Sequence, residues 1–178
     1  YKGDIPAAYG GRLSSLLDVR MKDGNAKKFG ITGSIGTVSS KLTLEGPIVK
    51  DRTTLLVSGR RTYADLFLPF AKDENVRDNK HYFYDYNLKL SHVINENNRH
   101  YLSGYAGRDT FKNQFASMGF GNQIASFRWN HLFTKKLFFN MSLIYSRYNY
   151  ELGTPEGEAT AFKWTSMMSD YSARFDFT

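Results

Sequence analysis

The chain has 178 residues, no cysteine and a formal net charge of +7, with 14 phenylalanines and 12 tyrosines. The lack of cysteine excludes disulfides and cysteine-based metal or redox sites. No apolar run approaches the roughly 18 to 20 residues of a membrane helix, which excludes spanning by helices. Lysines and arginines are scattered rather than clustered, which argues against nucleic-acid binding.

The first residues differ in pattern from the remainder of the chain. Residues 5–25 (IPAAYGGRLSSLLDVRMKDGN) begin with turn residues, continue with a strand-like alternation and end with another turn signal. Residues 30–36 (GITGSIG) superficially resemble a phosphate-binding loop, but the lysine and hydroxyl residue of that motif are missing. We therefore expect the glycines of this region to serve backbone geometry.

Period-2 alternation dominates the rest of the chain, in segments longer than the ~5 to 6 residues of a common soluble strand. In residues 82–94, one face carries tyrosine and leucine, and the opposite face carries aspartate, asparagine, lysine and serine. Such alternation predicts an amphipathic strand. Similar patterns predict strands in residues 30–45, 53–63, 99–109, 124–133, 137–150 and 170–178.

The links between these segments alternate in length. Short links at residues 46–52, 95–98 and 134–136 alternate with long links at residues 64–80, 109–122 and 152–163. Outer-membrane barrels show this asymmetry, with short periplasmic turns and longer extracellular loops. We therefore predict an all-β fold, a transmembrane antiparallel up-and-down β-barrel. This chain supplies about six wall strands, fewer than the ~8 that close a barrel.

The polar faces of the strands supply residues that are expected to face a barrel lumen. An arginine or lysine facing hydrocarbon costs ~2 to 4 kcal/mol at mid-depth, so charged positions should point inward, toward a plug or the solute path. This reasoning selects Asp85, Asn87, Lys89, Arg128 and Asn130. Function also concentrates in long loops on a rigid scaffold, which adds the extracellular-loop candidates Arg108, Asp109, Phe111 and Lys112.

Aromatic residues near strand ends predict the girdles that flank the lipid-facing band of a barrel. They are Tyr82, Phe83, Tyr84, Tyr148 and Tyr150. Binding of a sugar or an aromatic ligand by some of them is the alternative interpretation.

No pattern of catalytic or metal-binding residues accompanies these strands. The four histidines, His81, His92, His100 and His131, have no carboxylate or further histidine recurring at ligand spacing. The sequence also lacks a Gly-x-Ser-x-Gly motif and an ordered set of nucleophile, base and acid. We expect no enzyme activity, no metal and no cofactor.

Residues 2–25 resemble the end of the plug domain of TonB-dependent outer-membrane receptors of the Bacteroidetes type, either SusC/RagA-like or with a carboxypeptidase-regulatory-like domain. Residues 33–63 resemble the first barrel hairpin of such receptors. Residues 128–133 and 143–150 resemble later strands of the barrel.

The resemblance implies a division of the chain into the end of a plug, residues 1–28, and the beginning of a barrel, residues 29–178. Within the plug it implies a turn at Tyr9, Gly10 and Gly11. A last plug strand from Leu13 to Met21 would then lie inside the lumen, and residues 22–25 would form the exit turn.

The function implied by the resemblance is import of a scarce nutrient (a glycan, peptide, siderophore or cobalamin) across the bacterial outer membrane. The partners implied are outer-membrane lipid, the TonB–ExbB–ExbD complex acting through a TonB box outside this sequence, and a surface lipoprotein in some relatives. The chain begins with Tyr1 and shows no signal peptide, so we expect a piece of a longer protein. The alternatives are a plugless outer-membrane channel or adhesin, and a soluble β-rich binding domain whose tyrosine and leucine face packs against another sheet.

Overall fold

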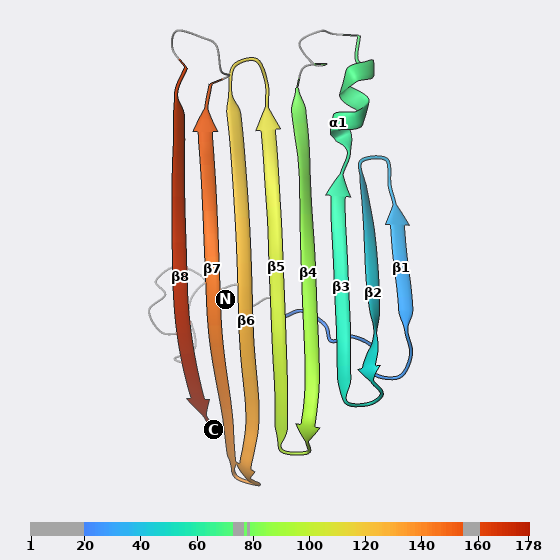
Figure 1. The fold of residues 1–178 in the computed structure, drawn as a ribbon, viewed down its shortest axis with the longest axis vertical. Coiled ribbons are helices and arrows are strands. Elements are labelled where there is room, and N and C mark those ends of the chain that lie inside the picture. Colours follow the sequence, from blue (N-terminus) through green and yellow to red (C-terminus); the bar gives the residue numbers. More distant parts are fainter. Residues whose placement is uncertain (1–19, 73–76, 78, 155–160) are drawn as a thin grey trace.

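The computed structural model describes residues 20–72, 77, 79–154 and 161–178, and most of them form one antiparallel sheet. Each strand pairs with the next strand along the chain (Figure 1). This confirms the predicted all-β, antiparallel, up-and-down arrangement. The elements are β1 (Gly30–Ile35), β2 (Ser39–Val49), β3 (Thr53–Thr62), α1 (Ala64–Phe67), η2 (Leu68–Phe70), β4 (Lys80–Asn95), β5 (Asn98–Lys112), β6 (Ser117–Thr134), β7 (Leu137–Gly153) and β8 (Lys163–Phe177).

The described residues form eight strands rather than about six. Part of the difference arises in residues 30–45, where the sequence pattern predicts one strand and the structure has β1 and the start of β2. The two strands are separated by a tight turn in which the Gly36 amide donates to the Ser39 carbonyl, with nitrogen and oxygen 2.9 Å apart. Small residues weaken the alternation on both sides, so the sequence pattern did not reveal the turn.

The prediction of a long loop over residues 109–122 is wrong, because β5 and β6 extend through most of this range. The link is a short turn closed by the side-chain oxygen of Asn113. It accepts hydrogen bonds from the amides of Phe115 and Ala116, at 2.9 and 2.7 Å. Gly119 and Gly121 of this range lie inside β6.

The two ends of the sheet differ in their links. Tight turns at residues 50–52, 96–97 and 135–136 join β2 to β3, β4 to β5 and β6 to β7, and we call this the tight-turn end. The opposite end, called the long-link end, carries the β3–β4 link with α1 and η2 and the β7–β8 link (Figure 1). No helix among the described residues is long and apolar enough to cross a membrane.

Each strand that enters a tight turn is irregular just before it. The pairing register shifts between Pro47 and Val49, between Val93 and Asn95, and between Leu132 and Thr134. Such bulges increase the local right-handed twist of a strand. All three therefore add twist at the same end of the sheet.

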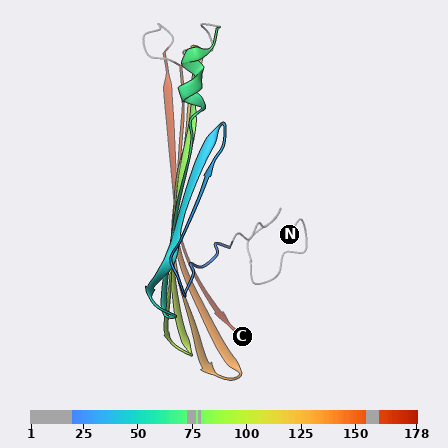
Figure 2. The ribbon, with the colours of Figure 1, turned by 90° about the vertical axis from the view of Figure 1, so that its right-hand side faces the viewer.

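The sheet is a single curved layer, as the edge-on view in Figure 2 shows. Among the described residues, Leu56 and Phe139 are the only buried large apolar side chains, whereas Leu42 is 51% exposed and Tyr171 80%. Globular domains bury the apolar face of a sheet against another layer. No described element supplies such a layer here.

Alternate residues point to opposite faces, and the register aligns residues of the same character across the strands. Leu88 lies opposite Val57 and Gly104, and the residue before it, Asn87, lies opposite Ser58. We call the face with Leu88 the apolar face and the face with Asn87 the polar face. A shift of one residue would exchange the two faces of a strand, so the side chains specify the register strongly.

A pair of engineered cysteines tests this register. Ser103 and Ser126 lie directly opposite each other in β5 and β6, and opposed residues hold their Cα atoms about 4.5 to 5.5 Å apart, within disulfide range. The double variant Ser103→Cys, Ser126→Cys of the full-length protein should therefore form a disulfide on mild oxidation, measured by mass spectrometry after thiol alkylation. The control pair Ser103→Cys, Ala125→Cys points to opposite faces and should stay reduced. The opposite pattern would show that the register is wrong.

Candidate functional site

The five residues predicted to face a lumen share one face of the sheet. Asp85, Asn87 and Lys89 are alternate residues of β4. Arg128 and Asn130 of β6 lie on the same face, because β5 pairs in register with both strands. The polar face is therefore the candidate functional site.

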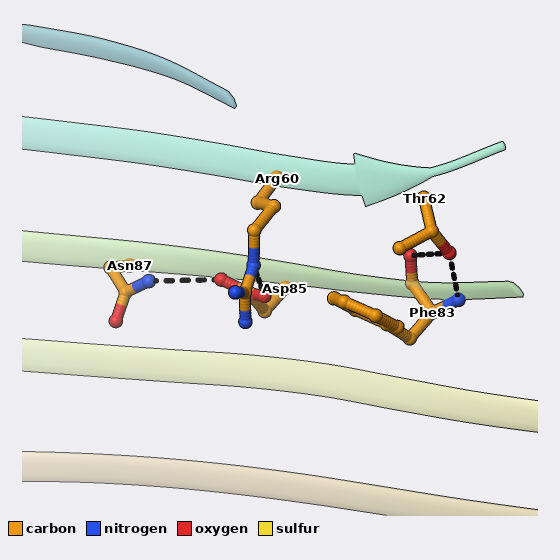
Figure 3. A network of polar contacts seen from close by, with 5 residues as sticks. All are labelled: Arg60, Thr62, Phe83, Asp85 and Asn87. Atoms are coloured by element: carbon orange, nitrogen blue, oxygen red, sulfur yellow. Dashed lines mark hydrogen bonds and ion pairs between the residues drawn. The ribbon is translucent and has the colours of Figure 1, made fainter. Parts of the chain in front are cut away.

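An ion pair between β3 and β4 lies within the network drawn in Figure 3. Arg60 Nε lies 2.7 Å from Asp85 Oδ2, and Asn87 Nδ2 donates to Asp85 Oδ1 at 3.4 Å. The Arg60 guanidinium carbon lies 4.9 Å from the centre of the Phe83 ring. At the end of β3, the Thr62 hydroxyl accepts a hydrogen bond from the Phe83 amide at 2.8 Å. The Asp85 side chain is 11% exposed and the Arg60 side chain 47%, so Arg60 keeps an accessible cationic side.

A second cluster places two cations against one tyrosine ring. Lys89 Nζ lies 5.4 Å and the Arg128 guanidinium carbon 4.7 Å from the centre of the Tyr101 ring, within the range of cation–π attraction. Arg128 Nε and Asn130 Oδ1 are buried and have no hydrogen-bond partner among the described residues. Because buried polar atoms nearly always find a partner, these two atoms mark a place where a further polar group would complete the face.

The coil before β1, residues 20–29, contacts the polar face and is drawn in blue in Figure 2. Asp23 accepts a hydrogen bond from Ser91 Oγ at 2.5 Å and lies 3.6 Å from Lys89 Nζ. Lys89 Nζ also donates to the Met21 carbonyl at 3.4 Å. Lys89 is only 5% exposed, and Asp23 supplies the carboxylate that compensates its charge.

Close approach and a second ion pair also fix the coil on the sheet. Lys22 Nζ lies 3.0 Å from Glu45 Oε1 on β2. Gly24 packs so closely on β3 that a Cβ atom there would overlap the Leu55 carbonyl oxygen. Only glycine fits this approach without a shift of one of the two backbones.

The turn residues Tyr9, Gly10 and Gly11 lie outside the described residues. So does most of the predicted plug strand from Leu13 to Met21. Its last two residues are described and form no strand. The position of that strand inside a lumen stays a prediction.

The four residues predicted for solute capture in a long loop are strand residues instead. Arg108, Asp109, Phe111 and Lys112 lie at the long-link end of β5 and alternate between the two faces. Arg108 belongs to the apolar face, where its Nη2 lies 2.9 Å from Glu151 Oε2. These four side chains therefore do not converge on one site.

The predicted aromatic girdle is divided between the faces. Tyr82 and Tyr84 lie on the apolar face, whereas Phe83, Tyr148 and Tyr150 lie on the polar face. The latter three therefore do not border the apolar face as expected. In the sequence, these three residues alternate out of phase with the apolar residues of their strands, which already indicates the polar face. Their position near strand ends does not show which face they share.

Arg60 and Tyr101 contact the predicted residues on the polar face, and the sequence reasoning missed both of them. Arg60 alternates in phase with Ser58 and Thr62 of β3, which was the available signal. Its pairing with Asp85 depends on the β3–β4 register, which the long link between these strands does not reveal. Tyr101 follows the polar phase of β5, but a tyrosine there reads as apolar in the sequence.

No group of three or more histidine, aspartate or glutamate side chains within the described ranges could hold a metal ion. Two of the histidines instead form hydrogen bonds near the tight turns. His92 Nδ1 lies 2.7 Å from Thr53 Oγ1, and His131 Nδ1 lies 2.6 Å from Asn98 Oδ1.

Comparisons of the chain with protein-family models, with curated proteins and with solved structures find no match.

The contact between Lys89 and the coil can be tested with Lys89→Met in the full-length protein. Asp23 then keeps Ser91 as its one described partner, and the coil loses both its ion pair with Lys89 and the hydrogen bond from Lys89 to the Met21 carbonyl. Hydrogen exchange measured by mass spectrometry should become faster in residues 20–26 and stay unchanged in β5 to β7. Lys41→Met, at an exposed lysine of the same face, is the matched control and should leave exchange unchanged. Unaltered exchange in the Lys89 variant would contradict the contact.

Proposed function

We propose that this chain is part of a TonB-dependent transporter of the bacterial outer membrane and forms wall strands of its transmembrane β-barrel. The transporter imports a scarce nutrient, such as a glycan, a peptide, a siderophore or cobalamin. It draws energy from the TonB–ExbB–ExbD complex of the inner membrane. The distribution of charge between the two faces of the sheet carries the membrane part of the proposal, and the resemblance of residues 2–25 to the end of a plug domain carries the transporter part.

Within the described strands, the apolar face carries no aspartate, glutamate, lysine or arginine between the tight-turn end and the level of Arg61, Arg108 and Arg147. An arginine or lysine facing hydrocarbon costs ~2 to 4 kcal/mol at mid-depth, whereas an aqueous surface tolerates scattered charge. This segregation supports a lipid environment for the apolar face. The charged residues at the same levels belong to the polar face: Lys41, Glu45, Arg60, Asp85, Lys89, Arg99, Arg128, Asp170, Arg174 and Asp176.

The height of the uncharged band fits a membrane. Arg108 follows the first residue of β5, Asn98, by ten residues. At a rise of ~3.4 Å per residue and a tilt of ~40°, this length spans roughly 26 Å along the membrane normal. Outer-membrane barrels carry an apolar band of ≈ 25 Å, so the band has the height of one bilayer core.

Aromatic side chains border the band at both edges. At the tight-turn end, the Trp129 ring lies 5.7 Å from the His131 ring and 5.6 Å from the Phe139 ring, measured between centres. Near the opposite edge, the rings of Tyr84 and Tyr86 lie 5.8 Å apart. Tryptophan and tyrosine favour the headgroup level of a bilayer, which supports the same orientation of the sheet in a membrane.

The coil on the polar face favours a plugged transporter over a plugless channel or adhesin. The polar face of a barrel wall faces the lumen, and here Asp23 of the coil lies 3.6 Å from Lys89 of β4. Residues 2–25 resemble the end of a plug domain, which occupies the lumen in that family. A soluble domain needs a second layer over the apolar face, and the described residues supply none.

Fractionation of cells that make the full-length protein tests the membrane location. We expect the protein in the outer-membrane fraction, resistant to carbonate extraction and released by detergent. Release by carbonate alone would refute the membrane proposal.

A matched pair of charge substitutions tests which face contacts lipid. Leu88→Arg places a charge on the apolar face, at a cost of ~2 to 4 kcal/mol, and should lower the amount of assembled protein in the outer membrane. Asn87→Arg is the control, because its side chain lies beside Asp85 on the polar face, and it should assemble like wild type. Equal assembly of the two variants, measured by heat-modifiable gel mobility, would contradict the assignment of the faces.

Growth of deletion strains on single-nutrient media tests energy coupling separately. On any nutrient for which loss of this protein slows growth, loss of TonB should slow growth as well, and the double deletion should add nothing. A nutrient that requires the protein but not TonB would favour a passive channel.

A further inference from the structure

A shallow groove of about 440 Å³ lies on the apolar face and crosses β5 to β8. Its lining from the apolar face includes Ala125 of β6, Ala173 of β8, Leu102 and Leu143, and the adjacent strand residues Ser126, Ile144 and Ser172 also border it. The groove exists because two alanines interrupt a face that otherwise carries leucine and aromatic side chains.

Two tyrosines line the groove on neighbouring strands. Tyr145 of β7 and Tyr171 of β8 have ring centres 5.0 Å apart, and Tyr171 is 80% exposed. The Leu102 side is apolar, whereas the tyrosine hydroxyls are polar. The lining therefore becomes more polar from Leu102 toward the two tyrosines.

Polar side chains follow at the groove's long-link side. Toward the long-link end, Arg147 follows Tyr145 on the apolar face of β7. Gln123 follows Ala125 in the same direction on β6 and lies opposite Arg147. Arg147 Nε donates to Asn149 Oδ1 at 3.3 Å. No carboxylate of the described chain forms an ion pair with Arg147, whereas Arg61 and Arg108 on the same face pair with acids at 3.3 and 2.9 Å.

We propose that this groove binds one membrane lipid with an anionic phosphate headgroup, its acyl chain against Ala125 and Ala173 and its phosphate at Arg147 and Gln123. The inference rests on the proposed outer-membrane location. It assigns to Arg147 the anion that the described chain does not supply, because guanidinium groups bind phosphate through charge-assisted hydrogen bonds. The apolar groove and the cation lie in the order in which an acyl chain and a headgroup follow each other in a lipid.

The order of these features favours a lipid over a second copy of the chain. A second copy would need a ridge that fits the groove and an acidic group that reaches Arg147. Between the tight-turn end and Glu151, the described strands carry no acid on the apolar face, and Glu151 already pairs with Arg108. A lipid supplies both the apolar chain and the anion in one molecule.

Native mass spectrometry of the purified full-length protein in mild detergent tests the proposal, with phosphatidylglycerol and phosphatidylcholine of identical chains as probes. One phosphatidylglycerol should be retained about five-fold more than phosphatidylcholine, the preference expected for one basic residue near an anionic headgroup. Arg147→Gln should remove this preference, and Ala125→Leu should reduce retention of both lipids by filling the groove. The matched controls are Arg61→Gln, a paired cation of the same face, and Val57→Phe, added bulk outside the groove, and both should behave like wild type.

Equal retention of the two lipids by wild type, or unchanged retention in the Arg147 and Ala125 variants, would overturn the lipid site. A dimer that Ala125→Leu dissociates would overturn it in favour of an interface between copies. Carbonate extraction of the same preparations separates this failure from that of the proposed function. A protein that stays in the membrane without binding lipid refutes the lipid site alone, and a protein released by carbonate refutes the membrane location.

Discussion

Backbone hydrogen bonds between neighbouring strands are the interaction on which the rest of this structure depends. The described residues bury two large apolar side chains, Leu56 and Phe139, so side-chain packing among these residues does not hold the sheet in shape. The ladder sets the register, and the register decides which side chains share a face. Both the polar face and the groove on the apolar face exist because eight strands keep the same phase.

The two faces use different interactions between strands. On the polar face, charged side chains join neighbouring strands or bind the coil, as in the pairs of Arg60 with Asp85 and of Lys89 with Asp23. On the apolar face, ring contacts such as that of Trp129 with Phe139 predominate toward the tight-turn end. Ion pairs are stronger where the two partners are partly removed from water. Ring contacts add to the stabilisation from apolar burial once another layer or a lipid covers the apolar face.

The sequence predicted the strands of this sheet well where alternation was strong and poorly where residue types gave conflicting signals. Residues 82–94 carry one of the clearest patterns and lie within β4. The prediction of a long loop at residues 109–122 is wrong, because Gly119 and Gly121 lack side chains and interrupt the alternation that would mark the start of β6. The capping role of Asn113 could not be separated from an ordinary loop asparagine. The types of the residues in a short segment do not show whether that segment is a loop or a tight turn between two paired strands.

The shared face of the five predicted polar residues could be derived from phase alone, but their partners could not. Arg60 lies across a long link from Asp85, and Asp23 lies far along the chain from Lys89. Such pairs depend on register and on the path of the coil, which have no local signature. The groove depends on alanines in β6 and β8, the two strands that flank β7, so it too becomes visible once the strands are placed side by side.

The identity of strand order and chain order has a consequence for how the sheet forms. Each strand finds its partner in the segment that immediately precedes or follows it, so pairing closes short stretches of chain and costs little loop entropy. Sheets built from local pairs assemble faster than those that need distant segments to meet. The sheet can therefore grow one hairpin at a time, and each added strand extends a template whose edge is already in register.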